Sequence, residues 1–174
     1  ELEGTILDTY NNLPPPENLQ HLIEAYGILF GILDDKVYFT AIGEPNYWPA
    51  ANFIDFSSGL AGLLAIQDGI LVFSSNKTDI IIGTTSDTFA KRPLSTEEGT
   101  VSHLSGKIVK STPVWVSKNG ICAYNSGTIQ VLSLDKLDQI TFNVVNTAVY
   151  NEQYFICLSD GSFVIMDVRF GLVF

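Results

Sequence analysis

Residues 27–42, GILFGILDDKVYFTAI, join two apolar runs through the polar turn Asp34-Asp35. The runs are rich in Ile, Leu, Phe, Val and Tyr, which are typical of strands, and Asp is typical of turns, so the stretch predicts a β-hairpin. Three later segments repeat the plan: GILVFSSNKTDIIIG (69–83), PVWVSKNGICAYN (113–125) and QYFICLSDGSFVIMD (153–167). We expect the four hairpins to turn at 34–36, 75–79, 118–120 and 159–162.

The four hairpins recur at a nearly constant interval. Aligning their turns makes Asp34, Ser75, Lys118 and Ser159 equivalent, at intervals of 41, 43 and 41 residues. The apolar positions Phe30, Leu71, Val114 and Phe155 recur at the same intervals. A period of about 42 residues is typical of a four-stranded β-propeller blade.

The residues between the hairpins supply two more strands per unit. An inner strand is expected before each hairpin: HLIEAY (21–26), LAGLLAI (60–66), GKIVKS (106–111) and NVVNTAVY (143–150). An outer strand is expected after each hairpin: NFIDF (52–56), a weak KRPLS (91–95), TIQVLS (128–133) and GLVF (171–174). The sequence therefore predicts an all-β, β-propeller-like chain of about four four-stranded blades.

The expected organisation is a lead-in followed by blades. Residues 1–20 are expected to be an extended, Pro-rich lead-in, because three consecutive prolines remove backbone donors, with a stray strand at 4–10. The blades are expected at approximately 21–57, 58–105, 106–134 and 135–174. Four blades could close on themselves, but the stray strand and the abrupt end at Phe174 favour an open arc or a larger propeller completed elsewhere. Short helical turns are expected only in STEEG (95–99) and SLDKLDQI (133–140), capped by Ser95 or Ser133.

The charge of the chain is strongly negative and uneven. The net charge is −10, and residues 1–76 hold ten Asp or Glu against the single basic residue Lys36. Nonspecific binding to nucleic acid or to anionic membranes needs clustered Lys and Arg, so both are disfavoured. No apolar run reaches 18 residues, so we expect no membrane insertion by this chain.

The sequence lacks the residues of a catalytic or metal site. His21 and His103 are the only histidines, and no G-x-S-x-G elbow accompanies them. Cys122 and Cys157 lie inside apolar runs and are expected to be buried and reduced. The two cysteines and the two histidines are too far apart in the sequence to form a zinc site. Asp34 and Asp35 are explained as residues of a hairpin turn and not as ligands of a calcium-binding loop. We therefore predict no enzyme activity, no catalytic or metal residue, and no cofactor.

One loop stands apart by composition. Residues 43–56, GEPNYWPAANFIDF, combine two prolines with a Tyr-Trp pair between two apolar runs. A rigid loop of this kind can cap a blade edge or dock a neighbouring subunit, which makes Tyr47, Trp48 and Pro49 candidate contact residues. The alternative is that Trp48 plugs its own domain.

The order of these segments resembles the β-propeller region of tail proteins of short-tailed bacteriophages and related prophages. That family includes the nozzle, or tail tubular protein B, and packaged-DNA stabilisation proteins. The resemblance covers residues 13 to about 137 and rests on the order LPPPENL, GILFGILDDKVYFTAIGEPNYWP, NFIDF, LLAIQDGILVFSSNKTDIIIG, FAKRPLSTEEGTVSHLSG and VWVSKNGICAYNSGTIQVLS. FTAIG departs from the family where a serine is common in the second strand, and the chain is much shorter than such nozzle proteins.

The resemblance implies a structural virion component, assembled in the bacterial cytoplasm, that forms part of the DNA-ejection channel of a phage tail. It implies a ring of copies, a homo-hexamer, joined to neighbouring tail and adaptor proteins, through which DNA passes without being tightly bound. A recognition module that binds a host-surface glycan or protein is the alternative, and a propeller enzyme is a third possibility that lacks catalytic groups.

The acidic residues of the segment 1–76 are candidates for the channel wall of an assembled nozzle. An acidic wall repels phosphate and lets DNA pass. We hypothesise that part of one acidic flank faces the channel, drawn from Glu17, Glu24, Asp34, Asp35, Glu44, Asp55 and Asp68. The rival account is that these carboxylates keep an outer surface soluble.

Overall fold

The computed structural model describes residues 13–133, 143–167 and 171–173. The strand expected at 4–10, most of the helical turn expected at 133–140 and Phe174 lie outside these residues. Within them, sixteen strands form four antiparallel sheets of four strands, each in sequential order. The prediction of an all-β chain with four four-stranded blades is confirmed.

Each sheet is one blade, and its four strands follow one another along the chain. Blade 1 holds β1 (Gln20–Ala25), β2 (Ile28–Leu33), β3 (Lys36–Phe39) and β4 (Phe53–Asp55), and blade 2 holds β5 (Leu60–Ile66), β6 (Gly69–Ser74), β7 (Thr78–Ile82) and β8 (Ala90–Ser95). Blade 3 holds β9 (Lys107–Val109), β10 (Thr112–Ser117), β11 (Gly120–Asn125) and β12 (Thr128–Val131), and blade 4 holds β13 (Val144–Tyr150), β14 (Gln153–Leu158), β15 (Phe163–Asp167) and β16 (Gly171–Val173).

The hairpins turn where the polar residues interrupt the apolar runs. Leu33 pairs with Lys36 across the Asp34-Asp35 turn, and Asp34 adopts a left-handed φ of 56° that Asp tolerates better than most residues. The other hairpins turn at 75–77, 118–119 and 159–162. All four turns therefore fall within the predicted ranges.

The core lies between neighbouring blades, which explains why the central strands are apolar on both faces. In β6, Ile70 and Val72 pack against blade 1, whereas Leu71 and Phe73 pack against blade 3. Such a strand buries both faces, so its apolar residues run continuously instead of alternating with polar ones. A third cluster, which includes Tyr154 and Ile156, joins blades 3 and 4.

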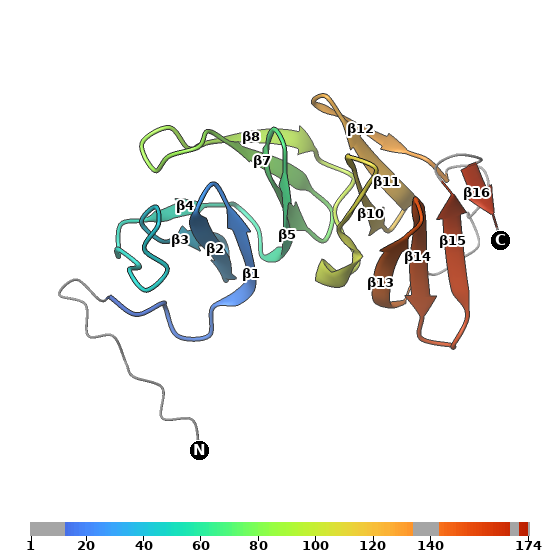
Figure 1. Cartoon of the computed structure of the whole chain (residues 1–174), viewed down its shortest axis with the longest axis horizontal. Coiled ribbons are helices and arrows are strands. Elements are labelled where there is room, and N and C mark those ends of the chain that lie inside the picture. Colours follow the sequence, from blue (N-terminus) through green and yellow to red (C-terminus); the bar gives the residue numbers. More distant parts are fainter. Residues whose placement is uncertain (1–12, 134–142, 168–170, 174) are drawn as a thin grey trace, which may run out of the picture.

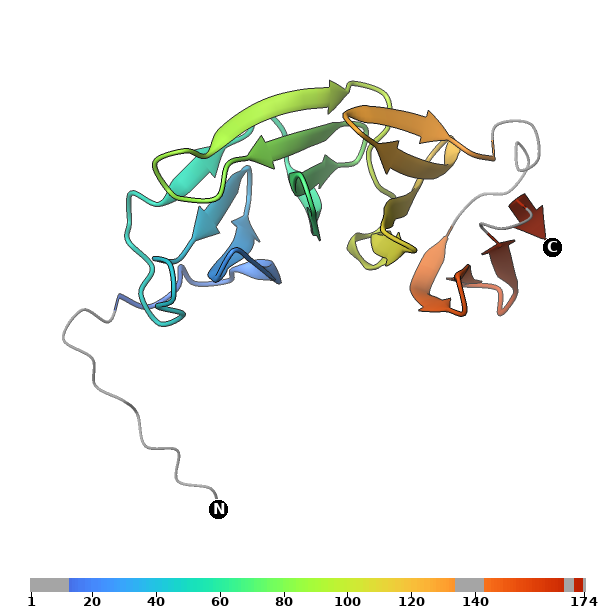
Figure 2. The same ribbon diagram turned by 45° about the horizontal axis from the view of Figure 1, so that its top comes forward.

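The four blades form an open arc (Figures 1 and 2). Figure 2 shows blade 1 at one end of the arc and blade 4 at the other. The inner strands β1 and β5 contact each other, as do β9 and β13, and the outer strands β8 and β12 meet on the opposite side. Of the two arrangements that four blades allow, the described residues adopt the open one.

Two local predictions are wrong. STEEG forms no helix, although Ser95 Oγ accepts the N–H groups of Glu97 and Glu98 as an N-cap would. The short 3₁₀ helix η1 (His103–Ser105), capped by Ser102, lies instead at the start of blade 3. Cys157 is exposed, because it lies on the face of blade 4 that no other blade covers. No helix among the described residues is long and apolar enough to cross a membrane.

Candidate functional site

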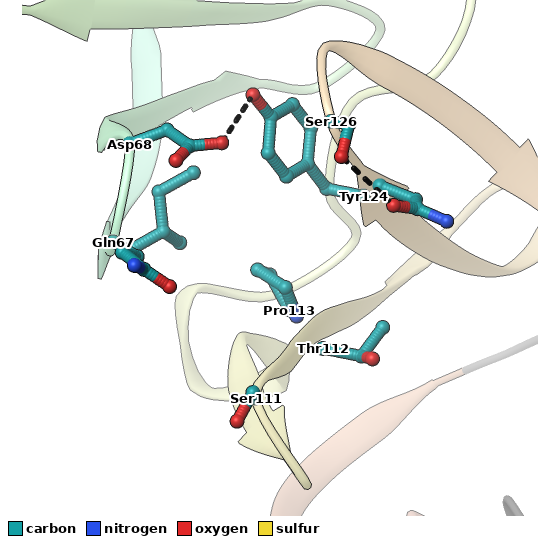
Figure 3. Close-up of a pocket in the computed structure, with 9 residues that line it drawn as sticks. Gln67, Asp68, Ser111, Thr112, Pro113, Tyr124 and Ser126 are labelled. Carbon is teal, nitrogen blue, oxygen red and sulfur yellow. Dashed lines mark hydrogen bonds between the residues drawn. The ribbon is translucent and has the colours of Figure 1, made fainter.

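A groove opens at the junction of blades 2 and 3 (Figure 3). Its volume is about 210 Å³. Three turns line it, the β5–β6, β9–β10 and β11–β12 turns with the strand ends beside them: Ile66, Gln67, Asp68, Ser111, Thr112, Pro113, Tyr124, Asn125 and Ser126. The sequence repeat did not reveal this groove, because its blade 2 wall, residues 66–68, lies more than forty residues from the blade 3 residues 111–113 and 124–126 that complete it.

Tight turns present the polar side chains of this groove. Lys110 and Ser111 have φ values of 49° and 70°, and Ser126 and Gly127 have φ values of 46° and 89°. Two consecutive residues with positive φ are typical of the two-residue hairpin turn that matches the twist of the flanking strands. The β9–β10 and β11–β12 turns lie at the same end of blade 3, because successive turns of an antiparallel sheet alternate between its two ends, so Ser111 and Ser126 line the same groove.

Hydrogen bonds connect some of the lining residues. Tyr124 Oη donates to Asp68 Oδ2 across 3.4 Å, and Ser126 Oγ donates to Asn125 Oδ1 across 3.2 Å (Figure 3). Burial raises the pKa of Tyr124, and the negative charge of Asp68 raises it further, so the phenol stays protonated as a donor. Hydroxyls, amides and one carboxylate suit a polar ligand that both donates and accepts hydrogen bonds.

The two histidines meet, although 82 residues separate them in the sequence. His21 of β1 and His103 of η1 have ring centroids 4.2 Å apart. Burial lowers the pKa of His21, and the neighbouring His103 lowers it further. Among the described residues no group of three or more His, Cys, Asp or Glu is placed to hold a metal ion.

The loop at 43–56 folds back onto the lead-in. Trp48 is 7% exposed, and its backbone N–H donates to the carbonyl of Leu13 across 3.0 Å. Tyr47 and Pro49 are half-buried, and their carbonyls accept the backbone N–H groups of Ala41 and Asn52 respectively. The burial of Trp48 agrees with the alternative that its side chain packs within its own domain. Tyr47 and Pro49 keep part of their surface exposed and available for contact.

One group of the acidic residues lies at the end of blade 1 where β2 turns into β3. The carbonyls of Asp34 and Asp35 accept the N–H groups of Leu60 and Phe56, so this turn contacts the linker that leads into blade 2. Asp55 ends β4 beside that linker and lies 3.6 Å from Lys36 Nζ. All three carboxylates are exposed.

Another group lies at the opposite end of the blade. Glu24 Oε1 accepts the N–H of Gly27, and the loop that carries Glu44 contacts the same turn through Gly43. Asp68, in the β5–β6 turn of the neighbouring blade 2, is close enough to raise the pKa of Tyr26, whose burial is the larger cause of the shift. Successive turns of an antiparallel sheet alternate between its two ends, so the structure separates the acidic residues into two groups. Glu17 lies in the lead-in before β1.

A polar network that the sequence analysis missed fixes the linker between blades 2 and 3. Glu98 Oε2 accepts a hydrogen bond from Ser117 Oγ across 2.6 Å, and Glu98 Oε1 accepts one from Asn119 Nδ2 across 2.8 Å. Trp115 Nε1 donates to the carbonyl of Gly99 across 2.9 Å. The spacing of Ser95 and Glu98 resembled a helix cap, and the structure uses both residues to anchor a loop.

No protein-family model matches this chain, and no curated protein is similar to it in sequence. Several solved structures share its fold. The computationally designed Ika4 protein aligns with 14% identity over 86% of this chain and 91% of its own, with a TM-score of 0.61. The N-terminal domain of Nup159 aligns with 18% identity over 94% of this chain, with a TM-score of 0.54, and Hsv2 of K. marxianus with 10% identity over 88%, with a TM-score of 0.57.

These similarities establish the fold. The chain covers 91% of Ika4 but only 45% of the Nup159 domain and 51% of Hsv2. It therefore has a β-propeller fold and spans about half the length of the two natural propellers.

Proposed function

We propose that this chain is a non-enzymatic β-propeller module that binds a partner protein through the groove between blades 2 and 3. The observation that carries this proposal is the groove itself, where three separate turns converge on one polar hollow. Rims of this kind, built from turns on a rigid scaffold, are where binding residues concentrate. The hydroxyl of Ser126 and the carboxylate of Asp68 would pair with the backbone and side chains of a polar loop on the partner.

The test is photo-crosslinking from the groove. A photoreactive p-benzoylphenylalanine at Ser126 should produce one dominant polypeptide adduct in cells that express the intact protein. The matched control is the same substitution at Ser86, an exposed serine in the loop between β7 and β8, which should produce none. Adding Asp68→Arg should abolish the Ser126 adduct. Saturable binding to a glycan array without a protein adduct would replace the protein partner by a glycan ligand. The absence of both an adduct and glycan binding would overturn the groove as a binding site.

A more specific candidate is a structural part of a phage tail nozzle, in the virion, arranged as a ring of copies with neighbouring tail and adaptor proteins. The ordered segments from LPPPENL to TIQVLS support it, as do the exposed carboxylates on both ends of blade 1. Electron microscopy of the assembled particle tests it. A ring whose lumen is lined by either acidic group supports the nozzle, and carboxylates that all point outward around a neutral or basic lumen contradict it.

A further inference from the structure

Equivalent residues of the repeat face the following blade. Phe30 of blade 1 packs against blade 2, Leu71 of blade 2 against blade 3, and Val114 of blade 3 against blade 4. All three are fully buried. The fourth equivalent, Phe155, is only half-buried, because it lies on the face of blade 4 that points away from blade 3.

The face around Phe155 is rich in exposed apolar side chains. Tyr154 and Ile156 pack against blade 3, so the residues between and beside them in β14 point the other way. Directly paired residues of antiparallel strands share a face, which adds the cross-strand partners of these positions. We define the blade 4 outer face by its apolar and aromatic residues and Cys157: Ala148, Tyr150, Phe155, Cys157, Phe163 and Ile165. The polar residues Asn146, Gln153 and Asp167 share this face, and Gln153 Nε2 donates to Asp167 Oδ2. Tyr150 is 73% exposed and Phe163 is 63% exposed.

The opposite end of the arc also presents an apolar face. The equivalents of Gly31 in the other blades are Val72, Trp115 and Ile156, and each is buried against the preceding blade. At Gly31 a Cβ would lie 2.7 Å from Leu19 and 3.0 Å from Leu22, so these two leucines take the place of the missing side chain.

We define the blade 1 outer face as Leu19, Leu22 and the apolar residues Leu29, Tyr38 and Phe53 on the Gly31 side of the sheet. The charged residues Glu24, Lys36 and Asp55 lie on the same side, near the strand ends. Leu22 is 58% exposed. The arc thus ends in two surfaces rich in apolar side chains, each at the repeat position that elsewhere is buried between blades. Exposed apolar patches of this kind mark interaction surfaces. Blade 4 exposes the side that elsewhere packs on the following blade, and blade 1 exposes the side that elsewhere packs on the preceding blade.

We propose that two copies of this chain pack head to tail, with the blade 4 outer face of each copy on the blade 1 outer face of the other. The same pair of surfaces already forms three times within the chain, at each junction between blades. Nearly the whole arc aligns with about half of the Nup159 and Hsv2 propellers, so two arcs supply the length of one such propeller. Two-fold symmetry makes both contacts identical and closes the assembly. This inference does not depend on the proposed function.

Light scattering coupled to size-exclusion chromatography tests the stoichiometry of the 174-residue chain. We expect a mass of about twice the 19.1 kDa of one copy. Phe163→Asp and Leu22→Asp should each yield the mass of one copy, because either charge faces an apolar surface across both contacts. Ile82→Asp in blade 2, on a side chain 36% exposed and away from both outer faces, should keep the doubled mass. A wild-type mass of one copy at about 100 μM would overturn the proposal.

Mixing the two variants distinguishes head-to-tail packing from other dimers. An equimolar mixture of Phe163→Asp and Leu22→Asp retains one contact between two unaltered faces, so a doubled mass of mixed composition should reappear. If blade 4 packs on blade 4 instead, Leu22→Asp alone keeps the doubled mass, which contradicts the proposal. Circular dichroism of each variant must match the wild type, and the Ile82→Asp control shows whether a surface aspartate by itself perturbs folding.

Discussion

At the scale of the residue, close approach of backbone segments limits what the chain tolerates. A Cβ on Gly99 would lie 2.2 Å from the carbonyl oxygen of Ser74 and 2.4 Å from the amide nitrogen of Asn76. Both atoms belong to the backbone of the β6–β7 hairpin and its turn, so no rotamer change relieves the clash. Gly99 therefore lets the interblade linker lie directly on the hairpin of blade 2.

Gly99→Ala should lower the free energy of unfolding by about 3 kcal/mol, because the linker must move away from the hairpin. Urea denaturation measures the change. The matched control is Gly59→Ala, because a Cβ at Gly59 meets no atom within 4 Å and its backbone is not left-handed. Equal effects of the two substitutions would show that backbone entropy, and not close approach, governs Gly99.

At the scale of the element, one linker side chain ties two blades together. Glu98 leaves blade 2 and bonds two residues near the β10–β11 turn of blade 3, Ser117 and Asn119. Its backbone N–H is held by Ser95 Oγ across 3.0 Å. Hydrogen bonds therefore connect Glu98 in the linker to Ser95 of blade 2 and to Ser117 and Asn119 of blade 3.

Glu98→Ala should reduce the free energy of unfolding by about 2 kcal/mol, because the hydroxyl of Ser117, the amide of Asn119 and the thiol of Cys122 all lose the carboxylate that accepts their hydrogen bonds. Thermal or urea unfolding provides the measurement. Glu97→Ala, at the exposed neighbouring position, should stay within about 0.5 kcal/mol of the wild type. A loss at position 97 as large as at position 98 would contradict the role of the network.

The contact between β1 and η1 should make stability depend on pH. The pKa of His21 is lowered in the folded protein, so the unfolded chain binds a proton at a higher pH than the native chain does. The contribution of neutral His21 to the free energy of unfolding is therefore fully present above the usual histidine pKa of about 6.5. It is lost as the pH drops through the lowered value. We expect the melting temperature to fall between pH 7.5 and pH 5.5, and His103→Gln to reduce that fall by removing the neighbouring imidazole.

The measurement is the change in melting temperature between pH 7.5 and pH 5.5, compared between the wild type and His103→Gln. Carboxylates also titrate toward acidic pH, so only the part of the difference that His103→Gln removes belongs to the histidine pair. Identical pH dependence in both proteins would refute the coupling.

At the scale of the whole molecule, the carboxylates at the two ends of blade 1 should disfavour binding to polyanions. Asp34, Asp35 and Asp55 cluster at one end, while Glu24 and Glu44 lie at the other, near Asp68 of the β5–β6 turn of blade 2. A surface of this sign repels phosphate and gains nothing from the release of counterions.

The protein should not bind duplex DNA at 150 mM salt, even at about 100 μM, in a fluorescence anisotropy titration. The triple substitution Asp34→Lys, Asp35→Lys and Asp55→Lys reverses one end of blade 1 and should produce salt-dependent binding. Saturable binding of the wild-type chain at this salt would contradict both the electrostatic argument and the nozzle candidate.

The sequence by itself determined the strands, the hairpin turns and the number of blades. Apolar runs, turn residues and the 42-residue period act within short stretches of chain, so no distant contact is needed to recognise them. It also identified Phe30, Leu71, Val114 and Phe155 as equivalents, and three of the four indeed pack against a following blade.

Only the tertiary structure decided which of these segments meet. The groove at Asp68 and Ser126, the contact between His21 and His103, and the separation of the acidic residues all depend on how one blade packs on the next. Side chains brought together by packing carry no local pattern in the sequence, because their positions depend on the curvature of the arc. For the same reason the repeat could not reveal that Cys157 is exposed, since a position facing the following blade is buried only where that blade is present.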